Sequence, residues 1–337
     1  MTAPPAVLAA QPGWTANAAV ATTQASPWLS VLMPTHVGDL WIDASLESIA
    51  AEDCRGIEVI MVDSSPDGAT LDRALRHADR LLLRTFSRPD LPMWPAKTNF
   101  AATLARAPYL CWLHQDDLWL AGRAGAIRRW IDSNPEVVLH IASSIIIDGK
   151  DRRLGFWTCP VPPDRQLPPS WLAERLIVQN FISTPAPVFR TDAWRASGGL
   201  DEDLWYTADW DIWLRLVATG PVRYHGEPTT AFRVHGGSLT MSGVQNVEGI
   251  AEQMHIVINR HLPSLPGRGA RVRRLAEASC GVNVALAAAS AGNLEHLPAA
   301  AARLIRLGPV GIYRYFRDSR LVERLLPRVA ARFVGAL

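Results

Sequence analysis

The stretch YLCWLHQDD, residues 109–117, places an apolar run directly before a histidine and two adjacent carboxylates. The apolar part, Tyr109 to Leu113, has the length and composition of a buried strand. Asp116 and Asp117 repel each other unless a positive charge lies close to both. A divalent cation is the simplest such charge, because hard cations such as Mg²⁺ take oxygen ligands. We therefore expect a buried strand whose end presents a metal site.

The composition is that of a folded protein of one large domain, or of one domain with an appendage. Of its 337 residues, 48% are hydrophobic, which excludes general disorder. The four cysteines are scattered without a CxxC pair, so a zinc ribbon is excluded and a reducing compartment is favoured. Residues 1–26 read as a flexible leader without signal-peptide character. No apolar run reaches 18 residues, so we expect no membrane-spanning helix and a cytoplasmic protein.

Short apolar runs alternate with segments of helical spacing along the first third of the chain. This alternation predicts βαβ units, an α/β fold and a mostly parallel sheet. Ligands of such sheets bind at the carboxyl ends of the strands. His36, Asp63, Asp116 and Asp117 each follow a predicted strand. The predicted strands lie at 30–33, 58–62, 80–84 and 109–113, and the predicted helices at 39–51, 68–78 and 95–107.

The remaining chain is expected to complete this domain and to continue into a helical region. We predict a catalytic domain over 27–240 and a helical C-terminal region over 241–337. The expected elements are a helix at 120–132, two or three strands over 137–157 with a turn at Asp148-Gly149, a loop at 158–170, a strand at 185–189, and helices at 208–219, 241–262 and 268–337.

Five segments, in this order and spacing, resemble the family 2 glycosyltransferases of the GT-A fold. The resemblance covers about residues 28–240 and implies a nucleotide-diphosphate sugar donor, a divalent metal and an acceptor hydroxyl. The acceptor would be a glycan, a polysaccharide or a lipid-linked saccharide. The segments are SVLMPTH (30–36), EVIMVDSSPDGAT (58–70), AKTNFAATLARAPYLCWLHQDDLWLAGR (96–123), GGLDEDLWYTADWDIWLRL (198–216) and FRVHGGSLT (232–240).

The resemblance implies that Asp116 and Asp117 hold the metal, Mn²⁺ or Mg²⁺, on the donor diphosphate. A metal there neutralises the charge that builds on the leaving group. His114 stands where the first acid of the DxD-type motif is common, and it could hydrogen-bond the ribose. His235 corresponds to a histidine near the metal or the diphosphate. The alternatives are that the two acids only cap the following helix, and that His235 is an ordinary loop residue.

The donor pocket, by the same resemblance, would contain Thr35, His36, Asp63, Lys97 and Asn99. Lys97 could face a phosphate as a point charge. Many relatives carry a second acid directly after the position of Asp63, where this chain has a serine, so recognition of uracil does not follow. A loop position for His36 and a solvated helix face for Lys97 are the alternatives.

Asp209 is the predicted general base. An inverting transferase needs a base that takes the proton of the acceptor hydroxyl. The resemblance places an acid pair here, and Ala208 replaces its first member. The alternative is that Asp209 only stabilises a helix N-terminus. Asp211 is expected to fix local structure by capping or by pairing with an arginine.

The C-terminal region is strongly basic. Residues 268–337 contain 12 Arg and 4 acidic residues, a net charge of +8. Arg314, Arg317, Arg320, Arg324, Arg328 and Arg332 would form one stripe on a helix, interrupted at Pro327. Such a stripe predicts either peripheral contact with the inner face of a membrane or a solvated face packed on the catalytic domain. Nucleic-acid binding is not expected, because no nucleic-acid motif accompanies the charge.

Two other functions compete with the transferase. A glycoside hydrolase would need an acid and a base flanking the glycosidic bond, but no nucleotide and no metal clamp. The strand-end acids argue against it. A degenerate transferase that binds sugar or serves as a scaffold is suggested by the three substitutions Ser64, His114 and Ala208.

Overall fold

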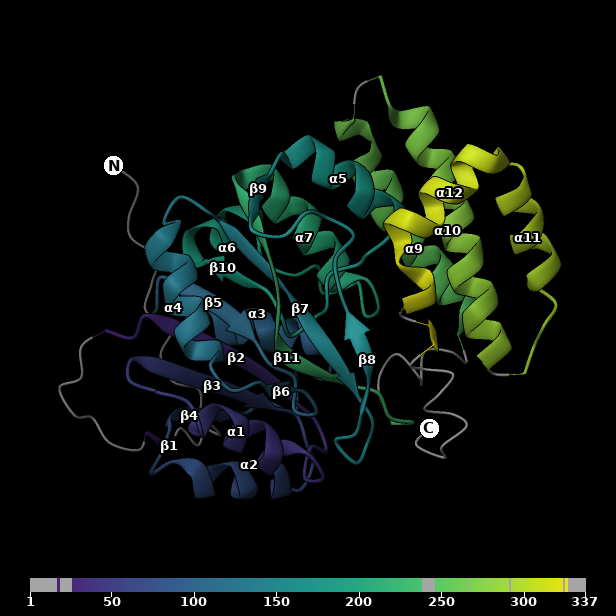
Figure 1. Cartoon of the computed structure of the whole chain (residues 1–337). Coiled ribbons are helices and arrows are strands. Elements are labelled where there is room, and N and C mark those ends of the chain that lie inside the picture. The colour runs from purple at the N-terminus through teal and green to yellow at the C-terminus, as the bar shows by residue number, and fades with distance from the viewer. Residues whose placement is uncertain are drawn as a thin grey trace, which may run out of the picture.

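The computed structural model describes residues 17–18, 26–237, 246–265, 267–290, 292–323 and 325–326. Its centre is an eleven-stranded sheet in the order β1-β4-β3-β2-β5-β10-β7-β11-β6, with β8 added on β7 and β9 on β11 (Figure 1). The strands are β1 (Asn17–Ala18), β2 (Leu29–Thr35), β3 (Ile57–Asp63), β4 (Leu82–Ser87), β5 (Tyr109–Trp112), β6 (Leu118–Trp119), β7 (Leu139–Ile147), β8 (Arg153–Trp157), β9 (Arg165–Leu167), β10 (Val188–Arg190) and β11 (Val222–Arg233).

The sheet is parallel only in part. Strands β4, β3, β2 and β5 pair in parallel, as the alternation of strands and helices predicts. The expected α/β fold with flanking helices is confirmed. Beyond β5 the sheet becomes mixed, because β10 runs antiparallel to both of its neighbours, β5 and β7. β11 then pairs in parallel with β7 and antiparallel with β6. The fold is therefore α/β with a mixed sheet.

Helices cover both faces of the sheet and continue into a bundle on one side (Figure 1). The bundle is formed by the helices after β11, which pack on α5 and α7. The helices are α1 (Ile42–Ala50), α2 (Ala69–Ala74), α3 (Trp94–Leu104), α4 (Arg123–Ser133), α5 (Pro169–Val178), α6 (Thr191–Ser197), α7 (Ala208–Thr219), α9 (Val247–His261), α10 (Gly269–Ser290), α11 (Leu297–Ile305) and α12 (Gly308–Ser319).

The central strands β2 and β3 are buried along their whole length and mostly apolar, because helices cover both faces of the sheet. In β2, Val31 and Met33 point to the side covered by α1 and α4, whereas Leu32 points to the opposite side. Successive side chains of a strand alternate between faces, which produces these two cores. The rigid parallel strands bring their carboxyl ends to one edge of the sheet.

Several boundaries differ from the expectation. The expected loop at 158–170 contains β9 and the start of α5. Two residues of the expected leader, Asn17 and Ala18, pair with Thr85 and Arg84 of β4. The expected arginine stripe is not on one helix, because α12 ends at Ser319 and Arg320 adopts a left-handed backbone with φ +49°. Arg324, Arg328 and Arg332 lie outside the described residues. Within the described ranges, no helix has the length and apolarity needed to cross a bilayer.

Candidate functional site

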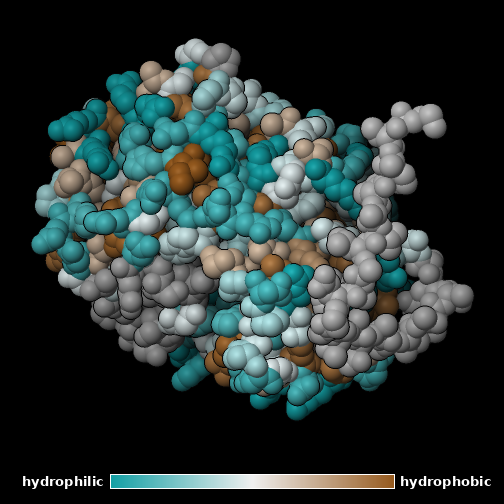
Figure 2. Space-filling model, turned by 180° about the vertical axis from the view of Figure 1, so that it is seen from behind, coloured by the Kyte–Doolittle hydropathy of each residue, from teal (hydrophilic) through white to brown (hydrophobic). Residues whose placement is uncertain are grey.

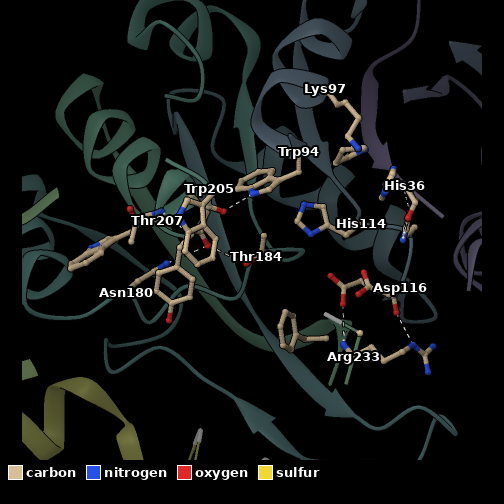
Figure 3. Close-up of a pocket in the computed structure, with 18 of the residues that line it drawn as sticks. His36, Trp94, Lys97, His114, Asp116, Asn180, Thr184, Trp205, Thr207 and Arg233 are labelled. Atoms are coloured by element: carbon tan, nitrogen blue, oxygen red, sulfur yellow. Dashed lines mark hydrogen bonds between the residues drawn. The ribbon is translucent and has the colours of Figure 1, made fainter. Parts of the chain in front are cut away.

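A cavity of about 400 Å³ opens at the carboxyl ends of β2 and β5. It is lined by every predicted site residue except Asp63 and Asn99. His36, Lys97 and Asp116 lie at one end, Asn180, Thr184 and Thr207 at the other, and His114 lies between them (Figure 3). The cavity therefore has an acidic, histidine-containing end and a second polar end.

The acidic end contains a compact group of potential metal ligands. His114, Asp116 and Asp117 each offer a ligand atom, and these atoms all lie within 4.8 Å of one another. Nε2 of His114 is buried and meets no hydrogen-bond partner in the part of the chain that the structure describes. Two carboxylates with one imidazole suit Mn²⁺ or Mg²⁺ better than a soft metal. The residues present thus fit a divalent cation.

The two carboxyl groups differ in how readily they ionise. Burial acts to raise the pKa of Asp116, but the hydrogen bond from His235 and the charges of His114 and His235 hold that pKa below its ordinary value. Burial and the neighbouring Asp116 charge raise the pKa of Asp117 well above its ordinary value. The raised pKa of Asp117 favours a proton on its carboxyl group, and a bound cation would displace that proton.

Two residues at the end of β11 hold the acid pair in place. Nε2 of His235 lies 2.9 Å from Oδ2 of Asp116. The backbone N–H of Arg233 donates to Oδ1 of Asp117 at 2.9 Å, and its Nε donates to the Asp116 carbonyl at 2.7 Å. The buried Arg233 guanidinium also pairs with Asp151 and stacks on Trp41 at 4.3 Å. The acid pair is thus tied to β11 from two directions.

The part of the acidic end that contains His36 and Lys97 is built around the ends of β2 and β3. The side chain of Gln115 bonds both ways to His36, accepting from its backbone N–H at 2.7 Å and donating to its carbonyl at 2.9 Å. Nζ of Lys97 donates to the Thr35 carbonyl at 2.7 Å and to Oγ of Ser64 at 2.8 Å. Burial lowers the pKa of Lys97 to about 8. Lys97 is thus a buried cation rather than part of a solvated helix face.

Asp63 and Asn99 do not line the cavity. Asp63 is fully buried beneath it, where its carboxylate accepts bonds from Thr35 and Ser65 at 2.8 Å each. Asn99 donates to the Leu200 carbonyl at 2.9 Å and accepts from the Leu200 N–H at 2.8 Å. Their hydrogen bonds run to protein groups, and donor contact by Asp63 or Asn99 stays a prediction. Both support the loops that surround the pocket.

Asp209 lies at the opposite end of the cavity, in the first turn of α7. Its Oδ2 accepts from Thr184 at 3.1 Å and from Asn180 at 3.3 Å, and its Oδ1 accepts from the Trp210 N–H at 2.7 Å. Burial raises the pKa of Asp209 to about 6, although these hydrogen bonds act in the opposite direction. A carboxylate in this state accepts a proton more readily than an exposed one.

Asp211, two residues further along α7, faces a different environment. It is fully buried and pairs with Arg215 at 2.7 Å, Arg260 at 2.9 Å and His261 at 2.8 Å. Burial opposes ionisation, yet these partners lower the pKa of Asp211 to about 2. The expectation of pairing with an arginine is confirmed, and Asp211 joins α7 to α9.

Sequence reasoning missed several residues of the pocket. Arg233 and Gln115 lie inside two of the segments that carry the family resemblance, FRVHGG and LHQDD, so their position was available as a signal. Asn180 follows α5, which the sequence did not reveal. The helical region also contributes Met254 from α9 and Asn283 from α10. No local motif marks these last residues, since only the packing of the bundle brings them to the pocket.

Part of this site lies in a segment of the chain that matches a known protein family. Residues 30–181 match the model of glycosyl transferase family 2. That span contains Thr35, His36, Lys97 and the acid pair, whereas Asp209 and His235 lie beyond it. An uncharacterized glycosyltransferase of Rickettsia typhi is 24% identical over 230 residues, which cover 66% of this chain and 69% of the relative.

Solved structures show a similar fold. TarS 1-349 of S. aureus, determined in complex with UDP-GlcNAc, aligns with a TM-score of 0.55 and 17% identity over 74% of this chain and 70% of that chain. The mannosyltransferase PcManGT of Pyrobaculum calidifontis, in complex with GDP-Man and Mn²⁺, aligns with a TM-score of 0.53 and 17% identity over 90% and 87% of the two chains. Against a longer TarS chain, the aligned part covers 42% of that chain.

Proposed function

The chain is a nucleotide-sugar-dependent glycosyltransferase of family 2, and on this premise we propose that it is metal-dependent and inverting, with Asp209 as the base. One observation carries the proposal. A single cavity has an acid pair that fits a divalent cation at one end and a carboxylate with a pKa of about 6 at the other. An inverting transfer needs a group that stabilises the charge on the leaving diphosphate and a base that takes the proton of the acceptor hydroxyl.

The donor diphosphate would lie at the acidic end. Asp116 and Asp117 would hold the cation, with His114 completing the compact group and His235 orienting Asp116 from the other side. The bound cation would neutralise the charge of the departing nucleoside diphosphate. The nucleoside would extend toward Thr35, His36 and Lys97. In support, PcManGT was determined with GDP-Man and Mn²⁺, and TarS with UDP-GlcNAc.

The acceptor hydroxyl would approach from the end that contains Asp209. As its oxygen forms the new bond to the anomeric carbon, its proton passes to the carboxylate of Asp209, and the bond from that carbon to the diphosphate breaks. Attack from the face opposite the leaving group inverts the anomeric centre. Asn180 and Thr184 fix the carboxylate by donating to Oδ2. With a pKa of about 6, Asp209 is mostly ionised at neutral pH and ready to accept the proton.

The acceptor would be a glycan, a polysaccharide or a lipid-linked saccharide. Peripheral contact with a membrane is supported by the C-terminal helices, where large apolar side chains are exposed beside arginines. Val310 and Tyr313 are 64% and 66% exposed, and Arg314 is the next residue along α12. Apolar and basic side chains together favour an anionic bilayer surface.

The test is a thermal-shift screen of UDP, GDP, dTDP, CDP and their sugars, each with Mn²⁺, Mg²⁺ or EDTA. A ligand that binds only the folded state raises the apparent stability. We expect one nucleotide to raise the melting temperature in a metal-dependent manner. Asp53→Asn is a matched control, because Asp53 is an exposed acid outside the cavity.

The same screen separates the competing functions. Metal-dependent nucleotide binding in the screen, together with no sugar release or transfer in a separate turnover assay, would favour a degenerate, sugar-binding subunit. Equal shifts with metal and with EDTA would exclude the proposed role of Asp116 and Asp117. The absence of any nucleotide shift would refute the proposed function as a whole.

A further inference from the structure

A second cavity, of about 580 Å³, lies on the helical region between α5, α10 and α12. Five arginines and two acids line it, so it carries a formal excess of three positive charges. We call it the arginine cleft, defined by Trp171, Glu174, Arg175, Arg268, Arg271, Arg314, Arg317 and Asp318. The excess charge makes an anion the natural ligand of this cleft.

Ion pairs within the arginine cleft satisfy only part of its charge. Glu174 pairs with both Arg268, at 2.9 Å, and Arg271, and Asp318 pairs with Arg317 at 2.7 Å. Among the described residues, Arg314 has no acidic partner. The cleft therefore keeps a free guanidinium at its rim, which can bind an anion without first losing a partner.

Besides Arg314, the cleft contains Arg175, whose guanidinium is more buried. Its guanidinium stacks on the Trp171 ring at 3.6 Å and donates to the Trp171 carbonyl at 3.2 Å. Its Nε is buried and meets no hydrogen-bond partner in the described part of the chain. Stacking fixes the guanidinium plane, and a fixed fork of donors matches the oxygens of a phosphate group.

The arginine cleft adjoins the active-site cavity through α5. Val178, the last residue of α5, lines the cleft, and the next residue, Gln179, lines the active-site cavity. Asn180, one residue further, donates to Asp209. One acceptor molecule could therefore place a hydroxyl at Asp209 and an anionic group in the cleft.

Apolar side chains lie beside the cleft on α12. Val310 and Tyr313 are largely exposed, and Arg317 lies 6.0 Å from the Tyr313 ring centre. From behind, the helical region, which lies on the left in Figure 2, shows brown apolar residues among teal hydrophilic ones. A ligand that combines an anionic head with a hydrocarbon tail would complement both features.

We propose that the arginine cleft binds the phosphate headgroup of an amphiphilic acceptor, whose hydrocarbon part lies on Val310 and Tyr313 of α12. This inference rests on the glycosyltransferase function proposed above, because it assigns the class of acceptor. It makes α5 the element that sets the spacing between the phosphate and the reactive hydroxyl.

The test is calorimetric titration of the full chain, in EDTA, with inorganic phosphate and with octyl phosphate. We expect octyl phosphate to bind at least tenfold more tightly, because its chain buries apolar surface. Arg314→Gln and Arg317→Gln should weaken both ligands at least fivefold. Tyr313→Ser should weaken octyl phosphate alone. Arg306→Gln, an exposed arginine outside the cleft, is the matched control and should change neither affinity.

Each contrary result overturns a defined part of the inference. Unchanged octyl phosphate affinity in both arginine variants would exclude the cleft as the site. Equal affinities for the two ligands, together with no effect of Tyr313→Ser, would exclude an amphiphile. The nucleotide thermal shift is measured on the same samples. If that shift persists while the phosphate results fail, only the cleft is refuted, whereas loss of the shift in the unmodified protein refutes the proposed function.

Discussion

Replacing Asp209 by Asn tests both the catalytic proposal and the electrostatics of the pocket. Burial raises the pKa of Asp209 from 3.8 to about 6. At about 1.4 kcal/mol per unit, keeping this carboxylate ionised costs the folded state up to about 3 kcal/mol at pH 8. Asp209 lines an open cavity and is only partly buried, so solvent screening should reduce this cost to about half of that value. Asn carries no charge and avoids this cost.

The sign of the pH dependence follows from the raised pKa. The destabilisation is fully present above the folded-state pKa of about 6 and is lost as the pH falls toward 3.8. The stability gained by Asp209→Asn should therefore be larger at pH 8 than at pH 5, by about 1 kcal/mol. Urea unfolding at the two pH values measures it, with unchanged slopes required.

Asp211→Asn is the matched control on the same helix. Its ion pairs lower the pKa of Asp211 to about 2, so Asp211 stabilises the fold above 3.8 and this contribution is lost as the pH falls through about 2. Removal of one partner from a buried ion pair costs about 3–5 kcal/mol. Asp211→Asn should thus destabilise the protein at both pH 5 and pH 8, opposite in sign to Asp209→Asn.

The activity of the same variant tests the role of Asp209. A positioned general base contributes about 10²–10⁴ in rate, so kcat of Asp209→Asn should fall by that factor. Nucleotide affinity should stay within about twofold, because Asn180 and Thr184, which donate to Asp209, lie at the end of the cavity away from Asp116 (Figure 3). A variant that keeps more than a tenth of kcat, or that gains no stability between pH 5 and pH 8, would refute the reasoning.

Three further substitutions probe the metal site, the donor pocket and the core. Asp116→Asn should abolish the difference between nucleotide affinity in Mn²⁺ and in EDTA, measured by calorimetry; a preserved difference would exclude Asp116 as a ligand. Lys97→Met should lower nucleoside diphosphate affinity in EDTA by about tenfold, because a cation is lost beside the donor site; equal affinity would limit Lys97 to structure. Glu58→Gln should cost about 3 kcal/mol in urea unfolding, because buried Glu58 pairs with Arg106 at 2.9 Å and Arg84 at 3.2 Å. Nucleotide affinity should not change in that variant, and a loss of affinity without a loss of stability would contradict the structural role of Glu58.

The sequence predicted strands β2 to β5 and the edge of the sheet that forms the site. Asp116, Asp117, His36 and Lys97 were recognisable because each lies at a strand end or in a segment typical of the family. Their convergence follows from the parallel strands, whose carboxyl ends share one edge. In the segment from β2 to β5, the elements predicted from the local sequence pattern are the ones that the fold contains.

The position of β11 and the surroundings of several site residues depend on tertiary packing, which no local sequence pattern indicates. β11 was missed because its apolar alternation is interrupted by the polar residues His225 and Glu227 and by Pro228, where its register with β7 shifts. Asp63 and Asn99 have the residue types of a ligand pocket, yet protein partners already occupy their polar atoms. Sequence shows which groups can bind, whereas only the fold shows which groups remain free to do so.

Met254 and Asn283 place the C-terminal helices in the wall of the active-site cavity. The division near residue 240 is therefore a boundary of sequence pattern, not of function. Exchange of the helical regions between two enzymes with this architecture would exchange part of the pocket as well. Such hybrids should change acceptor preference while the donor end remains that of the parent, which makes the helical region a unit for redesign of specificity.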